Sequence, residues 1–117
     1  MSTNKKERKD KMKVNEIISI INELKENDVN DEIKLFWMNE VECRIKADIF
    51  KKKHEEIKTI VSLSDDLSAP SPYSRLYVLY LCAMIEFGKG NYDSYYTIIV
   101  EFEKVFSEYA KYIIRSR

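Results

Sequence analysis

The sequence contains few of the residues on which turn-rich proteins depend. Among its 117 residues there are two glycines and two prolines. A β-sandwich or β-barrel needs many turns and therefore uses more of both. Helix-forming residues dominate instead, and the length suits a single domain. The composition predicts an all-α fold.

Cysteine and histidine are also scarce. Cys43 and Cys82 are 39 positions apart, and both lie in apolar helical patterns. Zinc and redox motifs place their cysteines much closer together, so we expect both residues to be small buried hydrophobes in a reducing compartment. The single histidine, His54, lies in the charged segment KKKHEE. We expect it to be a solvated surface residue.

The sequence lacks every catalytic motif that we sought. Triads, general bases and metal sites rely on histidine or on carboxylates that converge on one point. The acidic residues of Glu55–Glu56 and Asp65–Asp66 are adjacent in sequence and are not expected to converge. Glycine-rich phosphate loops, HExxH and EF-hand loops are absent. We therefore expect no enzymatic activity, no cofactor and no metal.

The longest apolar run is too short for a bilayer. It covers residues 76–85, about half of the length that a transmembrane helix needs, and Arg75 and Glu86 bracket it. The basic start of the chain is followed by VNEIISIINELKEN, in which Asn and Glu interrupt the apolar stretch. We expect neither a signal peptide nor a membrane segment.

Charge is balanced overall but unevenly distributed. Residues 1–13 hold six basic and two acidic residues, whereas residues 14–117 hold fourteen basic and eighteen acidic residues. The sequence thus predicts a basic N-terminal tail (1–13) before a mildly acidic helical domain (14–117). The cations of the tail are Lys5, Lys6, Arg8, Lys9, Lys11 and Lys13.

Three interpretations of the basic tail are open. It is a solvated end, an arm that binds DNA phosphates through counterion release, or a peptide that docks onto an acidic partner. No aromatic residue is interleaved with the charges, as would favour binding of single-stranded nucleic acid. We predict docking onto a neighbouring protein rather than onto DNA.

Hydrophobic periodicity predicts two helices in the first half of the chain. Residues 14–26 place apolar side chains at steps of three and four. A second helix is expected from Asn30, its N-cap, to the basic residues 51–53. Its apolar residues recur every four positions as Ile33, Trp37, Val41, Ile45 and Ile49.

The connection 54–71 is expected to be irregular. Its first half could prolong the helix or form a short extended segment, IKTIVSL, and its second half has the composition of a loop. The third helix is expected to have Ser71 as N-cap and Pro72 as first residue, and to end near Phe87.

A fourth helix of about 25 residues, capped by Asn91 or Asp93, follows the short turn GKGN. It should form an antiparallel hairpin with the third helix. The third helix is apolar all round, so we expect it to be central. The predicted core contains Trp37, Ile45, Leu76, Leu79, Leu81, Ile85, Ile99, Phe102 and Phe106.

The fourth helix should extend beyond the shorter third helix. Its last turns, residues 109–114, must then be covered by the second helix, by the connection 54–71 or by a neighbouring subunit. All eight tyrosines lie between Tyr73 and Tyr112, either as core edges or as a contact surface. The predicted subunit interface contains His54, Asp65, Asp66, Tyr109, Tyr112 and Ile113.

Four segments occur in a characteristic order: VNEIISIINELKEN, NDEIKLFWMNEVECRI, PSPYSRLYVLYLCAMIEFGKGNYDSYY and a long final helix ending in YAKYI. Their order and spacing, over roughly residues 14–62 and 70–113, resemble the small helical head–tail connector (adaptor) proteins of tailed bacteriophages. The Trp followed by an acidic-apolar helix is typical of them. Ser71 stands where such proteins often have an acidic residue, and the basic tail lies outside the resemblance.

The resemblance implies a non-enzymatic virion protein that is made in the host cytoplasm and located in the neck. Such proteins form a ring, dodecameric by resemblance, beneath the portal protein. The ring extends the channel for DNA and contacts the next neck or tail component. Two other classes stay open: a small helical partner-binding adaptor, and a DNA-binding accessory protein that acts through the basic tail.

Overall fold

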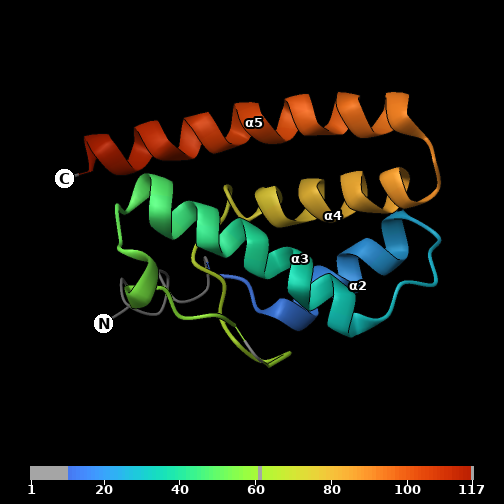
Figure 1. The fold of residues 1–117 in the computed structure, drawn as a ribbon, viewed down its shortest axis with the longest axis horizontal. Helices are drawn as coiled ribbons and strands as arrows, with labels where there is room; N and C mark the ends of the chain where they lie inside the picture. The colour runs from blue at the N-terminus through green and yellow to red at the C-terminus, as the bar shows by residue number, and fades with distance from the viewer. Residues whose placement is uncertain (1–10, 61, 117) are drawn as a thin grey trace.

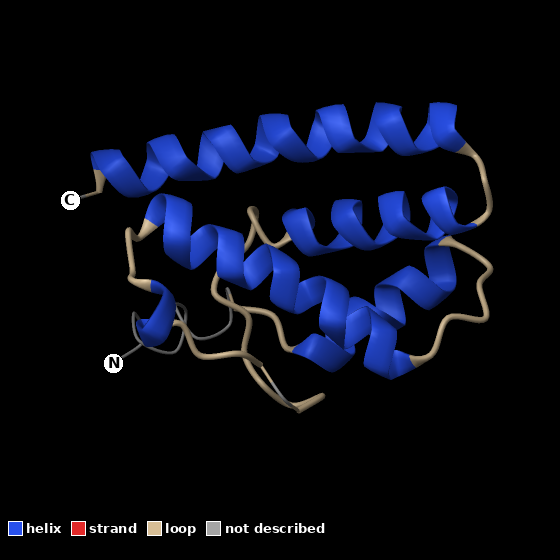
Figure 2. Cartoon of the chain, viewed as in Figure 1, coloured by secondary structure: helices blue, strands red, loops and turns tan. Residues whose placement is uncertain are grey.

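The structure, a computed structural model, describes residues 11–60 and 62–116. These residues form the helices α2 (Val14–Leu24), α3 (Asp31–Arg44), α4 (Arg75–Gly88) and α5 (Tyr92–Arg115). A π-helix, η1 (Ile45–Ile49), continues α3, and a 3₁₀-helix, η2 (His54–Glu56), lies in the connection to α4. No β-strand occurs in this part of the chain (Figures 1 and 2). The prediction of an all-α domain is confirmed.

The start of α2 is held by the connection between α3 and α4. The backbone N–H groups of Val14 and Asn15 have no partner within the helix. They donate to the carbonyl oxygens of Asp65 at 3.0 Å and Leu63 at 2.8 Å. The predicted irregular connection is thus confirmed as irregular, and it closes one end of the first helix.

The start of α3 agrees with the predicted cap, but its end does not. The Asn30 side chain accepts a hydrogen bond from the Ile33 N–H at 2.9 Å, as an N-cap does. The helix was predicted to reach residues 51–53, but η1 ends at Ile49. Lys51 has a φ of 57°, and this left-handed conformation stops helical structure.

The predicted start of α4 was wrong. The helix begins at Arg75, with Ser74 as the N-cap, rather than at Pro72. The Pro70 carbonyl accepts hydrogen bonds from the N–H groups of Tyr73 at 2.7 Å and Ser74 at 3.1 Å. These bonds fold residues 70–74 into a turn, which delays the helix.

Helix α4 contacts all three other α-helices and runs antiparallel to α5 (Figure 1). The turn between them depends on Gly90, whose φ of +80° suits glycine. With 14 and 24 residues, the two helices are about 21 and 36 Å long. The end of α5 therefore extends past the start of α4, as predicted.

The core lies around α4 and draws side chains from every α-helix and from the connection. Its largest fully buried apolar residues are Tyr77, Tyr109, Phe102, Ile17, Ile21, Met38, Ile45, Leu67, Leu76 and Leu81. Of the predicted core, Ile45, Leu76, Leu81, Ile85, Phe102 and Phe106 are buried.

Trp37, Leu79 and Ile99 are only partly buried, which corrects the predicted core. A strict spacing of four residues advances about 40° per step around an α-helix, so a stripe that starts at Ile33 drifts off one face. Trp37 consequently lies beside the core-facing side of α3. Leu79 is partly open because three neighbouring helices do not enclose α4 completely. Ile99 lies on α5, which packs chiefly against α4 and is open on its other side.

Candidate functional site

A buried carboxylate joins three elements of the fold. Glu42 of α3 is 1% exposed. The Tyr77 hydroxyl donates to its Oε1 at 2.6 Å, and the Ser68 N–H and hydroxyl donate to its Oε2 at 3.0 and 2.9 Å. The Ala69 N–H in turn donates to the Tyr77 hydroxyl at 2.9 Å. Burial, together with the Glu42 carboxylate, raises the pKa of Tyr77 well above its usual value.

This network fixes the connection to α3 and α4, and its hydrogen bonds are internal. Glu42 lines none of the grooves described below. A proton-transfer group must be within hydrogen-bond reach of a substrate, and such access is not provided here. The Glu42 network is therefore a structural feature.

The predicted subunit-interface residues are not all exposed. Tyr109 is 1% exposed, because the Tyr73 ring from the turn before α4 stacks on it with centroids 5.0 Å apart. Tyr73 lies just past the connection 54–71 that was predicted as one possible cover, so a neighbouring segment of the same chain covers the first part of the overhang. Ile113 is partly buried, whereas Tyr112 and the neighbouring Ile114 remain exposed.

The other predicted interface residues lie in the connection. His54 is exposed in η2. Asp66 forms an ion pair with Lys13 at 3.1 Å, and Asp65 is partly buried next to it in the chain. Asp66 is thus engaged within the molecule, which makes it less available to a neighbouring subunit.

Part of the predicted tail belongs to the folded domain. Lys13 pairs with Asp66 and also donates to the Ser64 carbonyl at 3.3 Å. The Met12 carbonyl accepts a hydrogen bond from the Leu67 N–H at 2.8 Å. The domain therefore includes Met12 and Lys13, which corrects its predicted start at residue 14.

Of the remaining tail cations, the structure describes Lys11 alone. Lys11 is exposed. Lys5, Lys6, Arg8 and Lys9 lie outside the described residues, so docking of the tail stays a prediction.

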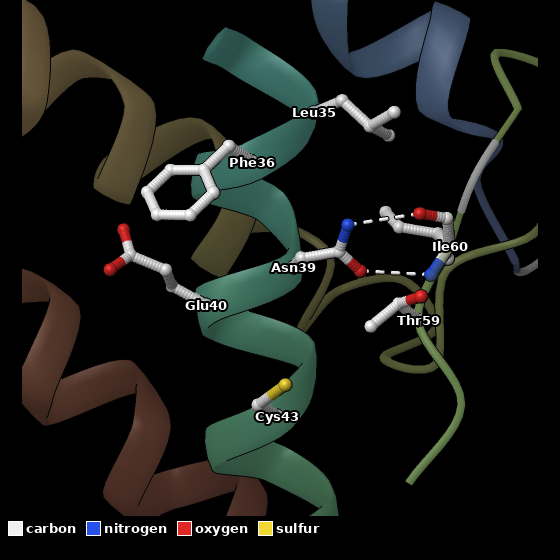
Figure 3. Close-up of a pocket in the computed structure, with 7 residues that line it drawn as sticks. All are labelled: Leu35, Phe36, Asn39, Glu40, Cys43, Thr59 and Ile60. Atoms are coloured by element: carbon white, nitrogen blue, oxygen red, sulfur yellow. Dashed lines mark hydrogen bonds between the residues drawn. The ribbon is translucent and has the colours of Figure 1, made fainter. Parts of the chain in front are cut away.

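An open groove runs between α3 and the extended segment before residue 61 (Figure 3). Asn39 holds this segment, because its amide donates to the Ile60 carbonyl at 2.9 Å and accepts from the Ile60 N–H at 2.8 Å. We call this the α3 groove, with a volume of about 700 Å³. It is lined by Leu35, Phe36, Asn39, Glu40, Cys43, Thr59 and Ile60.

The α3 groove has little reactive chemistry. Its thiol, Cys43, is a partly buried free cysteine. Glu40 accepts a hydrogen bond from the Tyr80 hydroxyl at 3.0 Å, and burial followed by this bond raises the pKa of Tyr80. A hydroxyl nucleophile is activated by a lowered pKa, whereas the pKa of Tyr80 is raised. The lining of the groove is mostly apolar, which suits contact with another molecule.

A second, smaller groove lies between the start of α3 and the end of α4. It has a volume of about 310 Å³, and its walls include Ile33, Trp37 and Met84. Trp37, predicted as a core anchor, thus lines a surface groove. Two adjacent aromatic residues cannot both face one side of a helix, and the Phe36–Trp37 pair was the signal in the sequence for an exposed aromatic surface.

At the other end of α3, an ion pair joins this helix to α5. Arg44 donates to both carboxylate oxygens of Glu103 at 2.7 and 2.6 Å. Its guanidinium lies 4.1 Å from the centroid of the Phe106 ring. The hydrogen bonds from Arg44 lower the pKa of Glu103, and the contact holds the two helices together.

Residues 11–60 and 62–116 contain neither a candidate metal centre nor a candidate membrane span. No group of three or more potential metal ligands gathers there. No helix among them combines the length and apolar character needed to cross a bilayer. No known family model, curated protein or solved structure matches the chain.

Proposed function

We propose that this protein is a structural subunit of the head–tail junction of a tailed bacteriophage. Its subunits would form a ring beneath the portal, extend the DNA channel and join the head to the tail. The observation that carries the proposal is the order of sequence segments that resembles the connector family. A Trp-containing helix, a Pro-Ser-Pro segment, an apolar helix and a long final helix follow one another.

The distribution of polar and apolar groups supports a role in protein contacts. Among the described residues, every buried side-chain polar atom has a hydrogen-bond partner. Large apolar side chains such as Phe36, Tyr96 and Ile114 are instead more than half exposed. Exposed apolar groups that gather in patches mark interaction surfaces.

Electron microscopy tests the proposal directly. The purified chain, alone at high concentration and mixed with a portal protein from the same phage, should form rings with a central channel. Monomers in both samples would contradict a connector role.

Deletion of the basic tail provides a second test, and the contact of Met12 determines how many residues can be deleted. Deleting residues 2–12 would remove Met12, whose carbonyl holds Leu67. Deleting residues 2–10 avoids this loss. The shorter deletion should weaken assembly onto the portal and leave the midpoint of thermal unfolding nearly unchanged. Normal assembly combined with leakage of packaged DNA would favour contact between the tail and DNA.

The two alternatives predict different behaviour. A partner-binding adaptor is favoured by the groove that Trp37 lines, because it offers an aromatic wall to a partner. Such an adaptor should remain monomeric at all concentrations. A DNA-binding accessory protein should bind DNA with an affinity that falls steeply with salt.

A further inference from the structure

Exposed apolar side chains gather at the end of the molecule where α4 turns into α5. The ring centroids of Phe87 and Tyr92 are 5.3 Å apart, and those of Phe87 and Tyr95 are 5.1 Å apart. On the neighbouring α3, Ile33 lines a groove with α4 residues next to Phe87, and Phe36 follows Ile33 by one helical turn. We define the corner patch by its exposed members, Ile33, Phe36, Phe87, Tyr92 and Tyr96, which are 44–65% exposed.

The last turns of α5 lie at the far end of this helix from the corner patch (Figure 1), and they expose a second apolar surface. Tyr112 is 45% and Ile114 is 63% exposed in the last turns of the helix. Lys111 and Arg115 flank them and are exposed as well. We call these four residues the C-terminal patch. It combines apolar contact area with positive charge.

The corner patch has a surplus of acidic side chains around one cation, Lys89, which lines the same groove and donates to the Glu26 carbonyl at 2.8 Å. Asp28 lines the groove beside Ile33, Glu32 lies one helical turn before Phe36, and Asp93 lies one turn before Tyr96. Within the described residues none of these three carboxylates forms an ion pair. The two patches therefore complement each other in both apolar character and charge.

The two patches of one molecule cannot meet. Tyr92 and Arg115 are the first and last residues of one straight helix of 24 residues, so they lie about 35 Å apart. We propose that the C-terminal patch of one copy of this chain docks onto the corner patch of a second copy. Lys111 and Arg115 would then lie against the acidic residues around the corner patch.

Such a contact joins different surfaces on the two copies. Repeated contacts of this kind close into a ring or grow into a filament, depending on the rotation between neighbours. The inference rests on the ring-forming part of the proposed function, and it identifies the two surfaces that meet. Of the predicted interface residues it retains Tyr112, and it leaves out His54, Asp65, Asp66, Tyr109 and Ile113.

Paired charge reversals provide the test. Lys111→Glu with Arg115→Glu makes both patches acidic, whereas Asp28→Lys with Glu32→Lys makes both patches basic. Sedimentation velocity of the full chains should show self-association of the unchanged protein and at least tenfold weaker association of either variant alone. An equimolar mixture of the two variants should associate again, because each patch then meets its opposite charge on the other variant.

Two controls separate this contact from general attraction between charged proteins. Lys51→Glu with Lys52→Glu changes the net charge by as much as Lys111→Glu with Arg115→Glu, but outside both patches. This variant should retain the association of the unchanged protein. Adding Tyr96→Ser to the basic variant should weaken the restored association. Thermal unfolding of each variant verifies that it folds.

The outcomes also distinguish the inference from the proposed function. If the unchanged protein forms oligomers and both reversals leave them intact, the assigned patches are wrong and ring formation stands. If the unchanged protein and the mixture are both monomeric at every concentration, the patches and self-assembly are both wrong.

Discussion

On α3, charged side chains are buried on the side that faces the core, and apolar side chains are exposed on the side that faces solvent. Lys34 and Glu42 are 2% and 1% exposed, whereas Ile33 and Phe36 of the same helix are 44% and 62% exposed. A helix on the surface of a globular protein usually buries its apolar side chains and exposes its charged ones. Here charged residues point inward, and part of the apolar surface faces solvent.

The difference shows which side of α3 finds all of its partners within one molecule. Burying a charge is costly unless hydrogen bonds compensate. Three donors contact Glu42, and the Lys34 Nζ donates to Asn22 at 2.7 Å. The exposed apolar side has no such partner within the described chain. It is the side from which we infer contact with another protein.

The largest expected effect comes from truncating a buried aromatic residue, and the matched change truncates an exposed one. Phe102→Ala should lower the free energy of unfolding by about 3–5 kcal/mol, because Phe102 is 2% exposed. The matched change Phe36→Ala removes the same ring from a side chain that is 62% exposed, and should cost about 0.5 kcal/mol or less. Chemical denaturation measures both. Similar losses for the two variants would contradict the distinction between core and docking surface.

The sequence was sufficient to predict the helices but not the orientation of α3. Ile33, Trp37 and Ile49 share a spacing of four, but an α-helix rotates by about 160° between the first and the last of them. The π-helix at residues 45–49 also changes the register near its end. Which residues face inward was decided by tertiary partners. Glu42 is buried because Tyr77 and Ser68 supply donors.

The candidate surfaces were predicted less well than the fold. The length difference between α4 and α5 correctly indicated an overhang, and Tyr112 is exposed there. Tyr109 is buried because Tyr73 stacks on it. That contact depends on the turn at residues 70–74, which periodicity could not predict. The corner patch combines residues of α3, α4 and α5. Because these residues are far apart in the sequence, no single sequence pattern could predict that they lie together.

The second prediction compares two glutamates of α3. Glu42→Ala leaves the Tyr77 hydroxyl and the Ser68 N–H without their acceptor, and should cost about 2–4 kcal/mol of stability. Glu40→Ala removes one exposed hydrogen bond to Tyr80 and should cost about 1 kcal/mol or less. Urea denaturation at neutral pH measures the difference. If Glu42→Ala is the milder change, the buried network does not hold the connection in place.

The third prediction concerns Tyr109, the predicted interface residue that is buried. Burial, and to a lesser degree the Glu42 carboxylate, raises its pKa from 10.0 to about 12. A raised folded-state pKa contributes stability that is present below the unfolded value and is lost as pH rises toward the folded value. Stability should therefore fall between pH 10 and 12, by about 2 kcal/mol from this group.

Tyr109→Phe isolates this contribution, because it keeps the ring that stacks on Tyr73. The variant should lose less stability than the unchanged protein between pH 10 and 12. Tyr96→Phe is the matched control, since Tyr96 is 65% exposed, and should follow the unchanged protein. Thermal unfolding at stepwise pH is the measurement. Identical pH profiles for all three proteins would place the Tyr109 hydroxyl in water.

The smallest expected effect concerns Glu86, the second buried carboxylate after Glu42. Glu86 of α4 is 7% exposed, but a cation satisfies it, unlike Glu42. Lys25 pairs with its Oε2 at 2.8 Å, and the Asn91 amide donates to its Oε1 at 2.9 Å. The hydrogen bonds from Lys25 and Asn91 lower the pKa of Glu86 below 4.5. The contact connects α4 to the residues flanking α2 and α5, at the end of the molecule that carries the corner patch.

A lowered folded-state pKa contributes stability that is present above the unfolded value and is lost as pH falls through the folded value. Glu86→Gln should therefore be less stable than the unchanged protein at pH 7. The difference should shrink as pH falls from 4.5 through the lowered folded-state value, because the unfolded chain takes up the proton first and the folded protein follows at lower pH. Glu108→Gln changes an exposed glutamate of α5 and should behave as the unchanged protein throughout. Urea denaturation from pH 7 to pH 3 makes the comparison. A deficit for Glu86→Gln that stays constant with pH would assign its effect to packing, and would leave no role for the charge of Glu86 in holding this end of the molecule together.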